Sequence, residues 1–360
     1  MEATLRITSR TAVLSGIAIV SVALLAGCAS APASSSSSAA TSKYLPCIVS
    51  DVSGFNDHSF NQLALSGITS ASPSNYKKVQ SKTENDYAAN ITSLVAQKCN
   101  LIVAAGFNLV AAVKTAADAN PNTGFAMIDD NSLTEKNVKS VVYETDEAAF
   151  LGGYIAASYS KTGIVATYGG AKYPSVTIYM DGFADGVAYY NKQKGKTVQV
   201  LGWDVASQNG TFVGGFTDQT LSNTIAKNFL DQKADVIVPV AGSLYQGAAA
   251  AIKASGGSAV LEGVDADVYN TDPTYKGLIL TSILKNLKPS VSDVVKSSAK
   301  GGTFDNSLYV GNLKNDGVGV APFHDYTSKV SSSLAGEIAT IKAGIIDGSI
   351  KVTSPSSFNK

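Results

Sequence analysis

The chain has 360 residues, of which 28 are basic and 28 acidic, so its formal net charge is zero. This balance argues against a nucleic-acid or polyanion partner, because binding by counterion release needs an excess of basic side chains. Hydrophobic residues make up 45% of the chain, which is ample for a folded core. The length exceeds what one core usually serves, so we expect two lobes.

Residues 1–27 have the pattern of a targeting signal peptide. Arg6 and Arg10 precede the apolar run TAVLSGIAIVSVALLAG, which is too short and too rich in Gly and Ala to favour a permanent membrane span. LAGC closely resembles a bacterial lipobox, which implies that Cys28 is lipidated and becomes the mature N-terminus; an ordinary signal peptide is the alternative. The Ser-rich stretch at 28–43 predicts a flexible tether to the extracytoplasmic face of the cell membrane.

Strand-like and helix-like segments alternate after residue 44. The strand-like runs lie at 45–51, 101–105, 124–128, 163–168, 197–202, 235–240 and 259–264. The helical patterns lie at 59–70, 86–98, 108–119, 174–192, 217–232 and 245–255. Strands that alternate with helices of this length are typical of β-α-β units around parallel sheets, so the predicted class is α/β with doubly wound lobes.

An internal repeat supports two similar lobes. QKCNLIVAAGFNLVAAVKTAADANPNTGFAMID at 97–129 aligns with QKADVIVPVAGSLYQGAAAAIKASGGSAVLEGVD at 232–265 with one inserted residue. Both segments contain an apolar strand, a Gly turn, an Ala-rich helix and a strand that ends in Asp. Chance similarity between Ala-rich segments is the alternative.

Three aspartates follow predicted strands. Asp51 ends the first strand, Asp129 ends a later strand of the first repeat, and Asp265 is its counterpart in the second. Ligands of α/β proteins bind beyond the carboxyl ends of the strands, where helix N-termini also point. If the lobes face each other, these carboxylates converge on one cleft; capping of turns or helices is the alternative for Asp51 and Asp265.

The turn VSDVSGFNDHSFNQLALSGI leads from the first strand into a helix. Ser59 and Gln62 match an S-x-x-Q capping box with Ser59 as N-cap, which puts Phe60 and Asn61 in the first helical turn at the mouth of the cleft. Phe60 also fits an apolar helical stripe, so a place in the core is an equal alternative for it.

Enzymatic chemistry finds little support in the sequence. The two histidines, His58 and His324, are far apart, and no Cys/His cluster has zinc spacing. There is no G-x-S-x-G, P-loop or G-x-G-x-x-G motif in a suitable context. We therefore predict a protein that is not an enzyme and needs no cofactor or metal, although cleft aspartates also suit a hydrolase.

Cys47 and Cys99 are candidates for a disulfide. Cys47 lies at the start of the first predicted strand and Cys99 lies just before the strand at 101–105. These strands are neighbours in the expected parallel sheet, and an exported protein meets oxidising conditions. Two buried free thiols are the alternative.

DVSGFNDHSFNQLALSGI resembles the D-x-G-G-x-x-D-x-S-F-N signature of the basic membrane lipoprotein family, the purine-nucleoside substrate-binding proteins of ABC importers. Agreement continues through GFAMID, ETDEAAFLGGYIAA, GFADGV, ADVIVPVAG, EGVDAD, ILTSILK and GVGVAPFHD. Ser53 departs from the family's usual Gly, which puts the conformation of the turn in doubt. The resemblance implies a type I periplasmic-binding-protein fold with a three-segment hinge, in which lobe one is 44–145 plus 282–312 and lobe two is 146–281 plus 313–360.

In the family's sites the nucleoside base lies between aromatic rings. By motif, the resemblance implies that Phe60 is one stacking ring and that Asn61 forms a hydrogen bond. The opposite ring comes from WDVASQNGTFVGGFTD, where Phe216 fits the family's F-x-D pattern and Phe212 follows a Gly turn. Trp203 is a third candidate, and at least one of these three rings is expected to belong to the core.

Carboxylates and a lysine hold the polar atoms of the ligand in the family. By motif, Asp129 binds the base edge, with the adjacent Asp130 as its rival, and Asp265 binds the vicinal hydroxyls of the ribose. Asp51 shares this last task.

Two further residues are assigned by the resemblance. Lys285 in SILKN reaches the sugar and balances nearby carboxylates. Gly242 in VAGS lets a backbone N–H approach the ligand, although a turn glycine has the same pattern.

The sequence thus predicts a lipid-anchored extracytoplasmic solute-binding protein that captures nucleosides, with purine nucleosides favoured, and delivers them to ABC permease and ATPase subunits. Another small polar ligand such as a sugar, a surface sensor or adhesin on the same scaffold, and a nucleoside hydrolase are the alternatives.

Overall fold

A computed structural model describes residues 44–358 of the chain. The predicted signal peptide, Cys28 and the tether to residue 43 lie outside this range. Within it, no helix is both long enough and apolar enough to cross a membrane.

The first sheet has six parallel strands in the order β13-β5-β4-β3-β1-β2. Its strands are β1 (Pro46–Ser50), β2 (Lys77–Gln80), β3 (Leu101–Ala105), β4 (Gly124–Ile128), β5 (Val138–Tyr143) and β13 (Tyr309–Gly311). The late strand β13 joins the edge of a sheet that is otherwise built from residues before 144.

The second sheet has the order β14-β12-β11-β10-β6-β7, and only the β12–β14 pair is antiparallel. Its strands are β6 (Ile164–Gly169), β7 (Gln199–Leu201), β10 (Val236–Val240), β11 (Val260–Asp265), β12 (Ile279–Lys285) and β14 (Val318–Val320). A separate short hairpin pairs β8 (Trp203–Asp204) with β9 (Asn209–Gly210).

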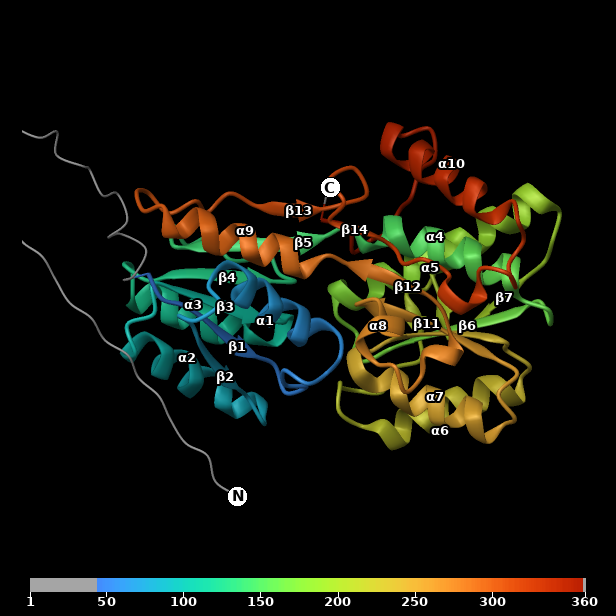
Figure 1. Cartoon of the computed structure of the whole chain (residues 1–360), viewed down its shortest axis with the longest axis horizontal. Helices are drawn as coiled ribbons and strands as arrows, with labels where there is room; N and C mark the ends of the chain where they lie inside the picture. The colour runs from blue at the N-terminus through green and yellow to red at the C-terminus, as the bar shows by residue number, and fades with distance from the viewer. Residues whose placement is uncertain (1–43, 359–360) are drawn as a thin grey trace, which may run out of the picture. The chain divides into compact units, whose positions relative to one another are not determined.

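Helices cover both sheets, as Figure 1 shows. Those packed on the first sheet are α1 (Phe60–Ala71), α2 (Tyr87–Ala96), α3 (Val110–Ala119) and α9 (Leu287–Ala299). Those of the second sheet are α4 (Thr145–Tyr159), α5 (Pro174–Lys194), α6 (Gln219–Asp231), α7 (Tyr245–Ala254), α8 (Val268–Thr271) and α10 (Leu334–Asp347). Short 3-10 turns are η1 (Glu84–Asp86), η2 (Phe107–Leu109), η3 (Gly242–Leu244), η4 (Lys276–Leu278) and η5 (His324–Tyr326).

The central strands are buried on both faces, as expected when helices cover both sides of a parallel sheet. In β1, Ile48 packs in the core that contains α1 and α9, whereas Cys47 and Val49 pack in the core that contains α2 and α3. This alternation places α1 and α9 on one face of the first sheet and α2 and α3 on the other.

The internal repeat is visible in the backbone. Lys98 and its counterpart Lys233 have φ values of 64° and 73°, and both precede a buried central strand. Such left-handed conformations are uncommon outside glycine, so their recurrence at matched positions argues for two related lobes rather than chance similarity.

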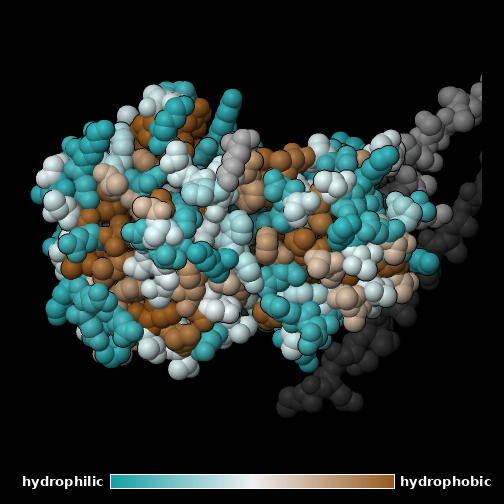
Figure 2. Space-filling view, turned by 180° about the vertical axis from the view of Figure 1, so that it is seen from behind, coloured by the Kyte–Doolittle hydropathy of each residue, from teal (hydrophilic) through white to brown (hydrophobic). Residues whose placement is uncertain are grey.

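The exposed surface of the described residues is mixed in character. Figure 2 shows hydrophobic areas interrupted by hydrophilic side chains. The large hydrophobic side chains that are exposed, Leu221, Leu308 and Ile346, lie far apart in the sequence.

Glu262 in β11 is a buried acid without a hydrogen-bond partner among the described residues. Its side chain is 0% exposed, and neither carboxyl oxygen is paired. Burial raises its pKa well above the ordinary value. The folded protein therefore keeps a proton on Glu262 that the unfolded chain loses above about pH 4.3.

Replacing Glu262 with glutamine is expected to change the pH dependence of stability. The wild-type contribution is fully present below about pH 4.3 and declines by about 1.4 kcal/mol per pH unit as the pH rises toward the raised pKa, because the unfolded chain binds fewer protons. Glutamine does not titrate, so the stability of the wild type relative to Glu262→Gln should fall by about 1.4 kcal/mol between pH 5 and pH 6. Urea unfolding of both proteins measures this relative stability, and parallel pH profiles would contradict the buried neutral acid.

Candidate ligand-binding site

A pocket lies between the carboxyl-terminal edges of the two sheets. Segments that follow strands of the first sheet contribute Asp51, Ser53, Asp57, Phe60, Asn61, Gly106, Phe107, Asn108 and Asp129. Segments of the second sheet and its helices contribute Tyr173, Ser175, Val176, Tyr179, Phe216, Val240, Ala241, Gly242, Val264, Asp265 and Lys285. Most of the residues predicted from sequence are therefore brought together here.

Asp129 and Asp265 face this pocket from corresponding strand ends. Asp129 directly follows β4 and Asp265 is the last residue of β11. Their φ values are 72° and 64°, in the left-handed region that side chains other than glycine, asparagine and aspartate rarely adopt. The repeated strands thus end in the same backbone conformation, and each presents a carboxylate to the cleft.

Lys285 joins these two carboxylates. Its Nζ lies 3.0 Å and 2.9 Å from the two carboxyl oxygens of Asp129 and 3.7 Å from Oδ1 of Asp265. The side chain is 3% exposed. Its ammonium also lies 5.0–5.6 Å from the ring centroids of Phe60, Tyr143 and Tyr179. Opposite charge and aromatic faces together compensate the burial of this cation.

Asp265 is oriented by two hydroxyl groups from opposite lobes. Tyr179 in α5 donates to Oδ1 at 2.9 Å, and Ser59 donates to Oδ2 at 3.2 Å. Ser59 also lies within hydrogen-bond distance, 3.1 Å, of the carbonyl of Val264. These contacts hold the carboxylate of Asp265 in one orientation.

The capping box predicted for Ser59 and Gln62 is wrong. Ser59 is the residue before α1, but its side chain makes no cap and points to Asp265 instead. Asp57 caps the helix, since its carboxylate accepts from the backbone N–H groups of Ser59, Asn61 and Gln62 at 2.8–3.1 Å. A carboxylate matches the positive end of the helix dipole better than a neutral hydroxyl does.

The side-chain amide of Asn61 forms hydrogen bonds with two other residues of the turn, Asp51 and Asp57. Its Nδ2 donates to Asp51 at 2.8 Å and to Asp57 at 3.1 Å, while Oδ1 accepts from the backbone N–H of Asp51. Asn61 therefore holds the two acidic residues of the turn in position. Its donors are already occupied, so Oδ1 is the atom that has capacity for a further hydrogen bond.

Ser53 is accommodated where the family usually has glycine. The left-handed residue of this turn is Gly54, with φ 72°, and Ser53 is not among the residues with positive φ. The backbone N–H of Ser53 donates to Oδ1 of Asp51 at 2.8 Å. The serine therefore causes no backbone strain at this position.

Three carboxyl groups of the pocket, those of Asp51, Asp57 and Asp129, have pKa values above their ordinary range. Burial is the largest cause and raises the pKa of Asp51 to about 6, against the opposing effect of its hydrogen bonds. Burial likewise raises the pKa of Asp57, and that of Asp129 despite the nearby Lys285. Four carboxyl groups and one lysine among the lining residues make an acidic site.

Five aromatic rings line the pocket: Phe60, Phe107, Tyr173, Tyr179 and Phe216. Phe60 is 9% exposed and belongs both to the core and to the pocket wall, so its two predicted roles coexist. Tyr173 lies 4.9 Å from Phe107 and 6.3 Å from Phe216, centroid to centroid, with interplanar angles of 26° and 28°. Phe107 and Tyr173 come from opposite lobes and meet across the cleft.

The two other aromatic candidates lie outside the pocket. Phe212 contacts Trp203 edge-on, with centroids 6.0 Å apart, and Trp203 Nε1 donates to Asp181 at 2.9 Å. Trp203 is buried, and Phe212 is a partly buried residue packed against the core. Phe216 is therefore the one of the three rings that the structure brings to the site.

Of the adjacent residues Asp129 and Asp130, only Asp129 lines the pocket. Asp130 accepts from the backbone N–H and the hydroxyl of Ser132 at 2.8 Å and 2.6 Å and does not line the pocket. It stabilises the loop that follows β4. Asp129 faces Lys285 instead.

Several lining residues were missed from sequence. Tyr179 lies inside a long helix and Phe107 follows the Gly turn of the first repeat, so both resemble core residues in the sequence. Tyr173 directly precedes Pro174, which is the first residue of α5. A search for side chains at helix N-termini beyond strand ends would have found Phe107 and Tyr173.

The two lobes and the pocket between their strand ends define a two-lobed α/β binding protein. Residues 46–354 match the family described as "ABC transporter substrate-binding protein PnrA-like" (Bmp). The chain belongs to this family of substrate-binding proteins, so it is a binding protein and not an enzyme. The hydrolase alternative is thereby set aside.

Similar proteins carry related names. The ABC transporter nucleoside-binding protein BmpA of Lactococcus lactis subsp. cremoris is 29% identical over 364 residues, which cover 96% of this chain and 99% of BmpA. Basic membrane protein A of Borreliella burgdorferi is 28% identical over 308 residues, which cover 83% of this chain and 85% of that protein.

Solved structures share the fold. An ABC transporter solute-binding protein from Aeropyrum pernix K1 aligns with a TM-score of 0.77 and 24% identity, covering 88% of this chain and 95% of that one. The arabinose-binding protein AraP of Geobacillus stearothermophilus aligns with a TM-score of 0.58 and 14% identity, covering 80% and 99%. The predicted type I periplasmic-binding-protein fold is confirmed.

Proposed function

We propose that this substrate-binding protein captures nucleosides, with purine nucleosides favoured, outside the cytoplasm and delivers them to the permease and ATPase subunits of an ABC importer. The observation that carries the proposal is the site itself, in which aromatic rings and paired carboxylates line one acidic pocket. The name of the Lactococcus lactis relative, a nucleoside-binding protein, agrees with it.

The base is proposed to lie against Phe60 and Phe216. Any base presents a π-face to such rings, and stacking contributes about 1–3 kcal/mol per base. Asp129, supported by Lys285, accepts hydrogen bonds from the N–H groups at the base edge. Gly242 lies at the start of η3, where no atom beyond its neighbours along the chain lies within 4 Å of the position a Cβ would take, and its backbone N–H is proposed to donate to the ligand.

The ribose is proposed to bind Asp265, whose carboxylate accepts from two vicinal hydroxyls. Asp51 and Lys285 complete this part of the site, and the oxygen of Asn61 offers one further acceptor. The excess of carboxylates disfavours a phosphate on the sugar, because like charges at close range repel strongly in a buried site. We therefore propose free nucleosides rather than nucleotides as ligands.

Ligand binding is proposed to close the two lobes about a three-segment hinge. Lobe one comprises residues from 44 to the start of α4 and a later segment that includes α9 and β13, and lobe two comprises the rest. We propose that the second crossing lies after Lys285 rather than at the predicted residue 282; the pairing of β12 with β14 as far as Lys285 supports this position. The third crossing lies near residue 312.

Attachment to the cell membrane is proposed to occur through lipidated Cys28, followed by the Ser-rich tether. This part of the proposal rests on the LAGC sequence, since Cys28 lies outside the described residues. A lipid on this residue would keep the binding protein close to its permease.

A thermal-shift panel of nucleosides, nucleotides, bases, sugars and amino acids tests the ligand class. Guanosine, inosine and adenosine are expected to raise the melting temperature, since a ligand at 100 times its dissociation constant adds about 2.7 kcal/mol of stability. Guanosine monophosphate is expected to give a much smaller shift. A response confined to sugars or amino acids would overturn the nucleoside assignment.

Phe216→Leu and Phe212→Leu form a matched pair for the same assay. Phe216→Leu should weaken nucleoside binding by about fivefold to 150-fold, which corresponds to the loss of one stacking contact. Phe212→Leu should leave affinity close to that of the wild type, because this ring packs outside the pocket. Equal effects of the two substitutions would remove Phe216 from the proposed site.

A further inference from the structure

Two segments from opposite lobes form a reciprocal contact beside the pocket. His58 lies in the loop between β1 and α1, and Thr271 is the last residue of α8, between β11 and β12. His58 Nδ1 lies 2.8 Å from the carbonyl oxygen of Thr271, and the Thr271 hydroxyl donates to the carbonyl oxygen of His58 at 2.7 Å. Neither residue lines the pocket.

The chemistry of this contact is determined by its acceptor atoms. A backbone carbonyl only accepts hydrogen bonds, so His58 Nδ1 carries the hydrogen and donates. Both residues are half-buried, so the pair remains partly accessible to solvent. His58 follows β1 of the first sheet and Thr271 precedes β12 of the second, so the contact exists only while the lobes are close together.

The short helix α8, which ends at Thr271, is also held by contacts with His324. His324 Nε2 lies 2.9 Å and 3.0 Å from the carboxyl oxygens of Asp267, which precedes α8. The His324 ring also stacks on Tyr269, with centroids 4.0 Å apart and an interplanar angle of 8°. Because α8 is held by these contacts, it moves together with the second lobe, and a hydrogen bond from His58 to Thr271 therefore joins the two lobes.

We propose that His58 and Thr271 form a latch that stabilises the closed state of the two lobes independently of which ligand is bound. Their role as positioning residues in ligand capture rests on the proposed function, but the latch itself does not. Because neither residue lines the pocket, the latch changes the affinity for every ligand by the same factor. Residues such as Phe216, in contrast, change the preference among ligands.

Thr271→Val and Thr271→Ser test the latch as a matched pair. Valine removes the hydroxyl and keeps the shape, whereas serine keeps the donor. One hydrogen bond of ordinary strength corresponds to about a fivefold change in an equilibrium constant. Relative to Thr271→Ser, Thr271→Val is expected to weaken binding of guanosine, inosine and adenosine by this one common factor, mainly through faster dissociation.

A second pair addresses His58, whose φ of 55° lies in the left-handed region. Asparagine and aspartate both tolerate this conformation. The amide of His58→Asn replaces the Nδ1–H donor and should retain the latch, whereas the carboxylate of His58→Asp cannot donate and should lose it. If Thr271→Val and His58→Asp both weaken binding while Thr271→Ser and His58→Asn do not, the effect comes from the lost hydrogen bonds and not from a general disruption of the loop.

Measurements without ligand separate this proposal from the nucleoside assignment. Small-angle X-ray scattering of the ligand-free protein should give a larger radius of gyration for Thr271→Val than for Thr271→Ser. Amide hydrogen exchange in the β1–α1 loop and in α8 should also be faster in the valine variant. Equal radii and equal exchange would overturn the latch even if nucleosides bind. Open lobes in the valine variant would support it even if they do not.

Discussion

Replacing Lys285 with methionine is expected to lower the free energy of unfolding by about 3–5 kcal/mol, the range found when one partner of a buried ion pair is removed. The side chain is 3% exposed and donates to both carboxyl oxygens of Asp129. Methionine fills a similar volume, so the loss comes from Asp129 and Asp265 being left without a cation. Urea unfolding at pH 7 measures it.

The exposed Lys114 provides the matched control. It also contacts two carboxylates, Asp118 at 2.9 Å and Glu135 at 2.7 Å, but its side chain is 55% exposed. Lys114→Met should change stability by less than about 1 kcal/mol, as exposed ion pairs do. Similar effects at both lysines would show that burial of Lys285 is not what makes its ion pair important.

The Lys285→Met effect should depend on pH in a defined direction. Burial already raises the pKa of Asp129, and Lys285 is the main influence that lowers it. Without the lysine this pKa rises further, and a carboxyl group with a raised pKa loses its stabilising contribution as the pH increases. The destabilisation should therefore be smaller at pH 5 than at pH 7, and combining Lys285→Met with Asp129→Asn should recover part of it at pH 7.

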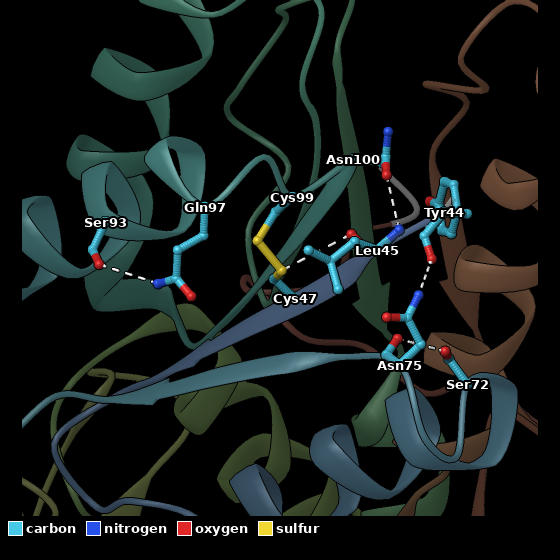
Figure 3. The surroundings of a disulfide bond; sticks show 9 residues. All are labelled: Tyr44, Leu45, Cys47, Ser72, Asn75, Ser93, Gln97, Cys99 and Asn100. Atoms are coloured by element: carbon cyan, nitrogen blue, oxygen red, sulfur yellow. Dashed lines mark hydrogen bonds between the residues drawn. A yellow bond between two sulfur atoms is a disulfide. The ribbon is translucent and has the colours of Figure 1, made fainter. Parts of the chain in front are cut away.

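Breaking the Cys47–Cys99 disulfide is expected to lower the free energy of unfolding by about 4 kcal/mol, the chain-entropy value for a loop of this size. The bond joins the pair that the sequence predicts, and the two cysteines lie 52 positions apart along the chain. Figure 3 shows it between β1 and the segment that precedes β3. Chemical unfolding with and without reductant measures the difference.

The folded structure should persist when this disulfide is reduced. Beside it, the backbone N–H of Leu45 donates to Asn100 Oδ1 at 2.8 Å, and the backbone N–H of Asn100 donates to the carbonyl of Leu45 at 2.9 Å. These hydrogen bonds hold the strands together without the sulfurs, so the loss arises mainly in the unfolded chain. Cys47→Ala with Cys99→Ala should not respond to reductant. A reductant effect below about 1 kcal/mol on the wild type, or no two-hydrogen mass shift, would contradict the prediction.

The sequence predicted those strands and helices whose apolar residues recur at regular spacing. The strands β1, β3, β4, β6, β10 and β11 and the helices up to α7, apart from α4, were found because each has a regular apolar pattern. The interior strands β5 and β12 and the later helices α9 and α10 were not predicted. The edge strand β2 was missed because its residues KKVQ are mostly exposed. Helix α4 was missed because it is buried on nearly all sides and therefore has no polar face to mark a helical period.

The sequence by itself determined the α/β class, the doubled lobes, the disulfide pair and the strand ends that carry Asp129 and Asp265. These follow from periodicity, an internal repeat and the rule that strand ends gather at one edge of a parallel sheet. Only the tertiary structure decided that Phe216 rather than Phe212 lines the pocket, that Asp57 caps α1, and that Ser59 and His58 reach the other lobe. The contacts of Ser59 and His58 join segments more than 200 positions apart, and the packing of one lobe against the other leaves no period or spacing in the sequence. The cap at Asp57 is local, but it exists because the Ser59 hydroxyl is engaged by Asp265 of the other lobe.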